Sequence, residues 1–349
     1  MEQSHGVEKY MKSQLTTLCY IEKDNSYLML HRIKKESDIN RDKWIGIGGH
    51  FEYGESPEEC LLREVKEETG LTLTQYRFRG IVTFVTTDGI AEYMCLYTAD
   101  AFTGTLTECD EGVLEWVPKE RFITMNLWEG DYIFLKLLED DAPFFSLKLV
   151  YEKDRMVQAV LDGKPMELFD ICDENGNPTG LIRERSVAHR YGGLHRTSHV
   201  WIVKRQGNQY FVLLQKRSHQ KDSYPDCYDI SSAGHIPAGV DFLESALREL
   251  KEELEIEAEP EELHFVGRRK KAAREVFYGK PFIDEQVMNV YVLCRDIEEK
   301  DLTLQKEEIE SVCFVEVEEC MERIRHNSIK HCIYEDEFEM VLNWCRKEK

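Results

Sequence analysis

The chain has 349 residues, of which 42% are hydrophobic and 32% charged, and its formal net charge is −22. This length predicts two domains that each bury a core, and no apolar run approaches the roughly 18 residues that span a membrane. A surface this acidic argues against a nucleic-acid polymer as partner, because binding a phosphate backbone requires clustered Lys and Arg. A small polyphosphate stays compatible if divalent cations supply positive charge.

The start of the chain, MEQSHGVEKYMKSQ, has neither an apolar core nor a cleavage site, so we expect no export. The eleven cysteines are scattered without a CxxC pair, which favours free thiols over a disulfide framework. We therefore expect a cytoplasmic protein. The sequence leaves its oligomeric state open.

Taken in chain order, apolar runs predict strands in the first half, followed by a helix. The strands are expected at 15–22, 27–33, 80–87, 92–99 and 113–117, and the helix at 128–140. The second half repeats this order, with strands at 199–205, 210–217, 263–267, 286–294 and 311–317 and a last helix at 335–347. This mixture predicts an α/β fold of the α+β type, in which each half is an αβα sandwich with a curved mixed sheet between helices.

Two segments resemble each other, GGHFEYGESPEECLLREVKEETGL from Gly48 and AGHIPAGVDFLESALRELKEELEI from Ala233. Both have the order strand, Gly-His turn and helix. A whole domain's length separates them, so we interpret them as a tandem duplication rather than a solenoid. We expect one domain over residues 1–150, a polar linker over 151–166 and a second domain over 167–349.

The helix of the first copy has clear start and stop signals. Ser56 is expected as N-cap, followed by Pro57 and by Glu59 three residues after the cap, and Gly70 fits a left-handed C-cap. Between these caps, Glu64, Glu67 and Glu68 stand at i, i+3 and i+4 and therefore share one helix face.

Three carboxylates on one face repel each other unless hard cations bind them, and Mg²⁺, with Mn²⁺ as substitute, is the expected ion. Gly48 lacks a side chain and can bring its backbone close to the metal. Arg63 could pair with Glu67 or Glu55, and we interpret Glu55 and Arg63 as an orienting ion pair. A solvated acidic helix is the alternative interpretation.

The first copy also matches GX5EX7REUXEEXGU at every fixed position, from Gly49 through Glu55 and Arg63 to Gly70. It therefore resembles the Nudix family of pyrophosphohydrolases, which act on nucleoside diphosphates linked to a group X. Residues of about 15–150 look like the MutT-like branch, the oxidised-purine nucleoside triphosphatases. That resemblance implies a metal-binding or catalytic-base glutamate at Glu111 and base-reading residues at Trp128 and Asp131.

Some features depart from that branch. Ile45 stands where human-type members carry a base-reading Asn, and Gly130 stands where a second acidic residue is expected. We therefore expect pyrophosphohydrolysis of a small nucleotide, with only modest discrimination of 8-oxo-dGTP. Trp128 could instead be a core aromatic, and either Glu64 or Glu111 could be the general base.

The second copy keeps Arg248 and the glutamates Glu249, Glu252 and Glu253, so a metal site is expected to survive there. Val240 replaces the first glutamate of the pattern, so Arg248 should lose a partner. Glu255 replaces the glycine, so the helix end is expected to change. The intact carboxylates favour a weaker or different hydrolase, while the two replacements favour a non-catalytic nucleotide-binding or regulatory module.

Residues of about 167–325 resemble the isopentenyl-diphosphate isomerase branch, through LFDICDENGNPTG, AHRYGGLHRTSHVWIV and SSAGHIPAG. The resemblance implies a metal site at His189, His195 and His235, with Asp284 or Glu285 as its acidic ligand. Ala233 replaces the catalytic cysteine of the isomerases, so isomerisation is not expected. The basic run 268–271 could clamp a diphosphate or form a solvated hairpin.

Overall fold

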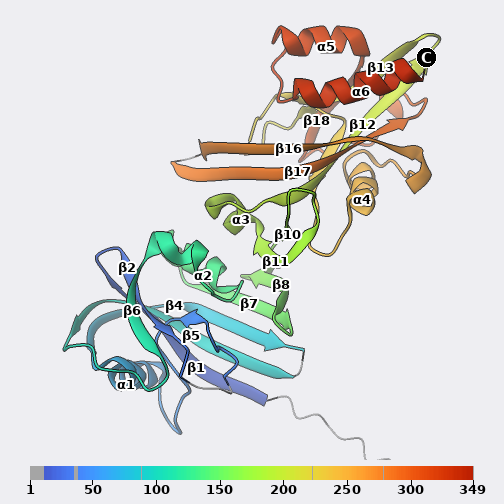
Figure 1. The fold of residues 1–349 in the computed structure, drawn as a ribbon. Helices are drawn as coiled ribbons and strands as arrows, with labels where there is room; N and C mark the ends of the chain where they lie inside the picture. Colours follow the sequence, from blue (N-terminus) through green and yellow to red (C-terminus); the bar gives the residue numbers. More distant parts are fainter. Residues whose placement is uncertain (1–11, 35–37, 88, 222, 278, 349) are drawn as a thin grey trace, which may run out of the picture. The chain divides into compact units, whose positions relative to one another are not determined.

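The computed structural model describes residues 12–34, 38–87, 89–221, 223–277 and 279–348, and its chain forms two compact units (Figure 1). Unit 1 comprises Met1–Leu168 and Ile182–Val187, and unit 2 comprises Phe169–Leu181 and Ala188–Lys349. The first eleven residues, on which the expectation about export rests, lie outside the described part. None of the described helices is long and apolar enough to cross a membrane.

Unit 1 is built on one mixed sheet of nine strands. The strand order is β3–β2–β1–β5–β4–β7–β8–β9, and β6 pairs with β2. The β1–β5 and β4–β7 pairs are parallel and the remaining pairs are antiparallel. The bounds are β1 Lys12–Lys23, β2 Ser26–His31, β3 Trp44–Ile45, β4 Thr72–Thr86, β5 Ile90–Thr103, β6 Val113–Pro118, β7 Phe145–Glu152, β8 Arg155–Leu161 and β9 Lys164–Pro165.

Two α-helices cover opposite faces of this sheet. They are α1, Pro57–Thr69, and α2, Asp131–Glu139, and a 3₁₀ turn, η1 (Lys119–Thr124), precedes α2. Along β1, Cys19 and Ile21 belong to the core cluster that includes Leu61 and Val65 of α1. Tyr20 lies between them and contacts Phe134 of α2, with ring centroids 5.9 Å apart. This alternation follows from the two-residue period of a strand and gives the expected three-layer arrangement.

The stretch expected to be a linker, 151–166, is part of the first sheet. Tyr151 and Glu152 end β7, and the rest contributes β8 and β9, paired through registers such as Leu149↔Ala159. Polar residues alternate with buried Met156 and Ala159 in β8, so the strand is half solvated and its composition resembles that of a loop. Unit 1 therefore ends later than expected.

Unit 2 repeats the architecture around a sheet of seven strands. The order is β14–β13–β12–β17–β16, with β15 paired to β12 and β18 to β13. The β12–β17 pair is parallel, as β1–β5 is in unit 1. The bounds are β12 His195–Gln206, β13 Gln209–Arg217, β14 Tyr228–Asp229, β15 Ser232–His235, β16 Leu263–Phe277, β17 Lys280–Cys294 and β18 Ile309–Glu316.

The helices of unit 2 again lie on opposite faces of the sheet. On one face α4 (Phe242–Leu254) packs on Val200 and Ile202. On the other, α5 (Val317–Arg325) and α6 (Glu335–Lys347) pack on the adjacent residue Trp201. Two short 3₁₀ turns, η2 (Pro260–Glu262) and η3 (Glu299–Asp301), complete the unit. The α/β sandwich expected for each half is thus present, and α5 is a helix that the sequence pattern did not predict.

A small hairpin precedes the second sheet. It consists of β10 (Leu168–Cys172) and β11 (Pro178–Glu184), and α3 (Arg185–Tyr191) follows it. Phe169 of β10 forms an isolated bridge with Pro237 and is fully buried. The hairpin therefore brings an aromatic ring to the loop that leads into α4.

Candidate active sites

The first candidate site is the loop and helix from Gly48 to Gly70. Ser56 caps α1 by accepting from the Glu59 amide, and Glu59 returns the bond to the Ser56 amide, as expected for a capping box. Pro57 occupies the first helical turn, and Gly70 ends the helix in the left-handed conformation, with φ 76°. Local sequence signals therefore fix both ends of the helix that carries the carboxylates.

Arg63 organises the charges of this site. Its Nε donates to Glu55 Oε1 at 2.7 Å and its Nη2 to Glu55 Oε2 at 2.9 Å, so the expected ion pair is present and bidentate. The guanidinium holds the pKa of Glu55 down at about 2. Nη1 also donates to Glu64 at 2.7 Å and to Glu67 at 3.2 Å, so the two pairings weighed from the sequence occur together.

Two glycines allow the loop to approach the helix. A Cβ on Gly49 would lie 2.5 Å from the Glu64 carboxyl, and a Cβ on Gly48 would lie 2.1 Å from the Thr17 carbonyl oxygen. The Gly48 amide donates to Glu68 Oε2 at 3.1 Å. Glu64 and Glu68 therefore lie against a loop that only residues without side chains can form at these positions, whereas Glu67 is mostly exposed and contacts Arg63.

The donor set of this site fits a hard divalent cation. Three carboxylates and the nearby backbone offer oxygen ligands alone, which Mg²⁺ and Mn²⁺ prefer. The absence of a side chain at Gly49 lets the Glu64 carboxylate lie against the loop, because a Cβ at position 49 would displace this carboxylate. Arg63 contacts Glu64 and Glu67, so their negative charge is partly balanced in the protein itself.

Glu111 lies in the loop between β5 and β6, and its carboxylate pairs with Arg32. The loop packs tightly on β2, since a Cβ on Gly112 would overlap the His31 carbonyl oxygen. Arg32 also donates to Asp38 at 2.7 Å. Sequence reasoning missed Arg32, because no local spacing links a residue after β2 to a loop after β5.

Trp128 forms part of an aromatic wall on the α2 face of the sheet. Its side chain is 9% exposed and packs edge-on to Phe84 and Tyr151, at centroid distances of 6.0 and 5.5 Å. The indole Nε1 donates to Asn40 Oδ1 at 2.8 Å, and Lys43 Nζ lies 4.8 Å from the ring centroid. The burial of the ring agrees with the core-aromatic interpretation of Trp128, and base reading stays a prediction. Asn40 and Lys43, which border the ring, were not expected from the sequence.

Asp131 begins α2 beside this wall, 9% exposed, and accepts from the Trp128 amide at 3.4 Å. Burial raises the pKa of its carboxyl to about 7, against the opposing effects of that hydrogen bond and Lys43. Ile45, expected as the apolar replacement of a base reader, packs against the core cluster on the α1 side. Its apolar side chain is therefore explained by packing.

The segment Gly234–Ile256 of unit 2 (the second box) matches Gly49–Leu71 of unit 1 (the first box) and keeps its contacts with one exception. A Cβ on Gly234 would lie 2.1 Å from the Glu249 carboxyl, and Arg248 Nη1 donates to Glu252 at 3.0 Å. The Ala233 amide donates to Glu253 at 3.3 Å, and burial raises the pKa of Glu253 to about 8.

The missing contact is that of the Arg248 guanidinium. Arg248 Nε is buried without a hydrogen-bond partner, whereas the matching Nε of Arg63 donates to Glu55. Val240 stands where that glutamate would be, so the loss of a partner follows as expected from the sequence.

The expectation that Glu255 changes the end of α4 is wrong. Glu255 adopts the left-handed conformation with φ 58° and ψ 29°, and its amide donates to the carbonyls of Leu250 and Lys251. Capping bonds and packing of the following Ile256 hold this geometry, although a residue with a Cβ is strained there.

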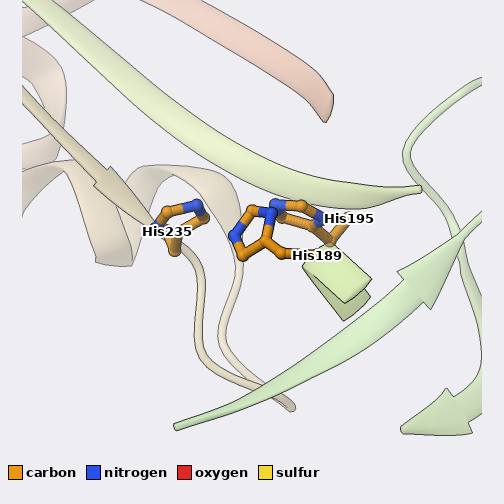
Figure 2. A group of neighbouring side chains, drawn as sticks. All are labelled: His189, His195 and His235. Carbon is orange, nitrogen blue, oxygen red and sulfur yellow. The ribbon is translucent and has the colours of Figure 1, made fainter. Parts of the chain in front are cut away.

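The three histidines expected from the isomerase resemblance lie together in unit 2 (Figure 2). His189 from α3, His195 from β12 and His235 from β15 place one ring nitrogen each within 4.8 Å of the others. His195 Nδ1 lies 2.8 Å from the Gly193 carbonyl and His189 Nδ1 lies 3.2 Å from the Ile283 carbonyl.

Because a carbonyl only accepts, each of these Nδ1 atoms carries the proton in the neutral ring. In this tautomer the lone pair is on Nε2, which can then bind a metal. The cluster is enclosed by aromatic rings, since Phe169 stacks on His195 and on His235 at 4.8 and 4.9 Å.

The acidic residue beside this cluster is Asp284, whose Oδ1 lies 4.0 Å from His189 Nδ1. Glu285, the next residue of β17, projects toward the opposite side of the strand, as the two-residue period requires. Lys271 Nζ donates to Asp284 at 2.7 Å.

The side chains of the basic run 268–271 form pairs with other residues of the chain. Arg269 donates to Asp336 at 2.6 Å, Lys270 to Glu174 at 2.8 Å and Lys271 to Asp284, while Arg268 donates to Asn289 at 2.8 Å. The run therefore lies on the β16–β17 hairpin with Arg268 and Lys270 exposed, as the solvated-hairpin interpretation expects, while binding of a diphosphate stays a prediction.

Comparison with known proteins identifies the family of the segments that contain these two sites. A NUDIX domain model matches residues 12–138 and 193–336. An uncharacterised Nudix hydrolase of Clostridium acetobutylicum is 38% identical over 153 residues, which are 44% of this chain and 71% of that protein. Nudix hydrolase 3 of Arabidopsis thaliana is 41% identical over 157 residues, which are 44% of this chain but only 20% of the plant protein.

Two further matches are more distant. The oxidized purine nucleoside triphosphate hydrolase of Danio rerio is 28% identical over 130 residues, which are 37% of this chain and 83% of that protein. A MutT protein structure from Bacillus halodurans aligns with a TM-score of 0.40 and 25% identity, covering 44% of this chain and 99% of that one. With a box segment inside each range matched by the domain model, the chain belongs to the Nudix hydrolase family and carries two NUDIX domains in tandem.

Proposed function

We propose that unit 1 hydrolyses the pyrophosphate bond of small nucleotides, that is, of nucleoside diphosphates linked to a group X, with Mg²⁺ or Mn²⁺ as cofactor. The observation that carries this proposal is the arrangement around Arg63, which binds Glu55 through two hydrogen bonds and contacts Glu64 and Glu67. Hydrolysis of a polyphosphate needs bound cations. The carboxylates of α1, a helix capped at both ends, would be their ligands.

When bound, Mg²⁺ neutralises the polyphosphate and lowers the pKa of a water molecule. Glu64, Glu67 and Glu68 would hold it, with the backbone at Gly48. The proton of the attacking water passes to a carboxylate, and both Glu64 and Glu111 remain candidates. Arg32 on Glu111 and Arg63 on Glu64 fix each candidate in position.

Trp128 and its neighbours support a nucleoside as the recognised part of the substrate. An aromatic wall with Lys43 and Asp131 at its border suits a purine base, which stacks on the ring and offers polar edges. The Danio rerio relative's name supports (oxidised) purine nucleoside triphosphates as one substrate class. Selectivity for 8-oxo-dGTP over dGTP is expected to stay below about 10⁴-fold, because Ile45 contributes no hydrogen bond.

For unit 2 we favour weak or different hydrolysis over a purely regulatory nucleotide-binding module. Glu249 against Gly234 and Glu253 at the Ala233 amide support it, since they repeat the contacts of Glu64 and Glu68. The partnerless Nε of Arg248 supports the alternative. The cluster of His189, His195 and His235 suits a metal that accepts imidazole ligands, a second proposal for this unit.

The acidic charge of −22 and the free thiols of all eleven cysteines support a small-molecule substrate and a reducing cytoplasmic compartment. The test is a screen of the full-length chain against nucleoside triphosphates, 8-oxo-dGTP and other nucleoside diphosphate derivatives, with Mg²⁺ and with chelator. We expect metal-dependent release of a nucleoside monophosphate. Absence of turnover on every compound would overturn the proposal.

A further inference from the structure

Both units hold a threonine at the same place beside the box. Thr16 of β1 forms an antiparallel bridge with His50, the residue after Gly49. Thr197 of β12 pairs in the same way with His235, the residue after Gly234. Because the two sheets share this register, the polar groups that surround the two threonines can be compared position by position.

Each threonine binds a side chain on the neighbouring parallel strand. Thr16 Oγ1 donates to Glu92 Oε1 at 2.8 Å on β5, and Thr197 Oγ1 donates to Gln286 Oε1 at 3.4 Å on β17. The two contacts have identical register, since each acceptor stands two residues before the residue directly opposite the threonine. Unit 1 thus has a carboxylate where unit 2 has a neutral amide.

Glu92 lies between the box loop and the aromatic wall. Across the α2 face of the sheet, Thr16 on β1 comes first, then Glu92 on β5, then Phe84 on β4, which is the direct partner of Glu92. Trp128 packs on Phe84 and on Tyr151 of β7. Neighbouring strands are about 4.8 Å apart, so roughly 10 Å separate β1 at the box from β4 at the wall.

The carboxylate of Glu92 is positioned and accessible to a ligand. Thr16, 4% exposed, fixes one oxygen, and no Lys, Arg or His in the described part of the chain forms an ion pair with Glu92. Gln14, the partner of Glu92 on β1, lines an open cavity of about 530 Å³ together with residues 50–55 of the box loop. Glu92 therefore stands one strand away from this cavity, between Gln14 on β1 and Phe84 on β4.

We propose that Glu92 binds the sugar of the nucleotide by accepting hydrogen bonds from the 2′- and 3′-hydroxyls, so that unit 1 prefers ribonucleotides to deoxyribonucleotides. This inference rests on the proposed function. A nucleotide with its diphosphate at the box and its base on the wall brings its sugar to β5. A carboxylate accepts hydrogen bonds without donating them, and a cis-diol offers two donors to it, which is a general way for proteins to recognise ribose.

The experiment compares kcat/KM for GTP with dGTP, and for ATP with dATP, using the full-length chain with Mg²⁺ in a Glu252→Gln background that silences the box of unit 2. We expect a preference for the ribonucleotide of about 10- to 100-fold, the usual effect of one hydrogen bond to a charged group. The ratio should fall toward one in Glu92→Ala, and partly in Glu92→Gln, which reproduces the amide of unit 2.

Thr16 acts as a positioning residue for Glu92. Thr16→Val should lower the ribose-to-deoxyribose ratio, and Thr16→Ser, which keeps the hydroxyl, should restore it. Asp100→Asn, at an exposed position of the same strand, is the matched control and should leave the ratio unchanged.

The outcomes separate the two proposals. Turnover with a ratio near one in the starting protein, or a ratio that Glu92→Ala does not change, overturns the sugar assignment and leaves the proposed hydrolase intact. Absence of turnover for all four nucleotides overturns the proposed function and the sugar assignment with it.

Discussion

Unit 1 ends its box helix on Gly70 and unit 2 ends the matching helix on Glu255, and both residues adopt the left-handed conformation. The contacts of the arginine side chain, in contrast, differ between the two units. Arg63 binds Glu55 through two hydrogen bonds, while the Nε of Arg248 is buried without a hydrogen-bond partner. The left-handed helix end is therefore present in unit 2 although Glu255 has a Cβ. The arginine–glutamate contact is absent there although the fold is the same.

The comparison shows which features the architecture enforces. Packing around the sheet fixes the helix, its end and the approach of Gly49 or Gly234 to a glutamate. The partners of the arginine are set by single side chains, and a helix on a packed sheet tolerates their loss. Function can thus diverge between the units at residues that contribute little to folding.

The largest effect is expected from removing one charge in the first box. Glu67→Gln keeps the shape of the side chain and should lower turnover of the full-length chain by at least about 100-fold, because the metal loses an anionic ligand. The same substitution in unit 2, Glu252→Gln, should have a much smaller effect on the same substrate. Steady-state rates with Mg²⁺ for both variants and the double variant measure the contrast.

Glu108→Gln, at an exposed position outside the box, is the control for this pair. Equal losses in Glu67→Gln and Glu252→Gln would show that the two sites contribute alike. Full activity in Glu67→Gln would rule out the first box as the active site.

Two buried carboxyls, Asp131 in unit 1 and Glu337 in unit 2, are expected to respond to pH in opposite ways. The pKa of Asp131 is raised from 3.8 to about 7 by burial, so the folded state holds this proton more tightly than the unfolded state. The contribution of protonated Asp131 to the free energy of unfolding is then fully present below about pH 4. It decreases as pH rises to 7, by at most about 1.4 kcal/mol per pH unit. Asp131→Asn should remove this loss.

The buried carboxylate of Glu337 in unit 2 is paired with a histidine. Glu337 accepts from His199 and from Trp201, both at 2.9 Å. The charge of His199 lowers the pKa of Glu337 although burial opposes it, so its contribution is present above pH 4.5 and is lost on acidification.

Calorimetric unfolding from about pH 3 to 8 measures both effects, with Asp100→Asn as control. Asp131→Asn should gain stability relative to the starting protein as pH rises. Glu337→Gln should be less stable than the starting protein above pH 4.5, and this difference should shrink on acidification. A stability difference for Asp131→Asn that does not vary with pH would contradict the raised pKa.

Restoring the missing partner in unit 2 is expected to have a moderate effect. Val240→Glu should give the Nε of Arg248 an acceptor and raise the hydrolysis due to unit 2 by several-fold, since a fixed guanidinium orients Glu249 and Glu252. The rate is measured in a Glu67→Gln background. Val240→Gln, which has the shape but not the charge, should raise it less, and an equal rise in both would point to packing.

The smallest effect is expected at the helix end. Glu255→Gly should stabilise unit 2 by about 0.5–1 kcal/mol, because glycine adopts the left-handed conformation without strain. The unfolding transition of unit 2 in the full-length chain measures it. Glu255→Ala keeps the Cβ and should give no such gain, so stabilisation by both would indicate that strain is not the cause.

The sequence predicted the parts of the molecule that depend on local rules. The caps at Ser56 and Gly70 follow from the residue types at the two ends of α1, and the Arg63–Glu55 pair joins the helix to the residue before its N-cap. The alternating burial along β1 follows from the two-residue period of a strand. The histidine cluster was expected only through a resemblance to the isomerase branch, and the structure brings its members together.

What the sequence could not predict depends on contacts between distant segments. Arg32 meets Glu111 and Thr16 meets Glu92 across 79 and 76 residues, where no spacing rule applies. β8 was taken for a linker because its solvated face is polar, and its pairing with β7 becomes evident only in three dimensions.

Unit 1 is discontinuous, since it includes Ile182–Val187 after the chain has already entered unit 2. Arg183 of that segment donates to Glu129 at 2.6 Å and lies 3.9 Å from the ring centroid of Tyr132. A fragment cut after residue 150 would lose β8, and one cut after residue 168 would still leave this face of α2 uncovered. No single cut therefore yields both units whole, so dissection of the two activities is better done with point variants in the intact chain.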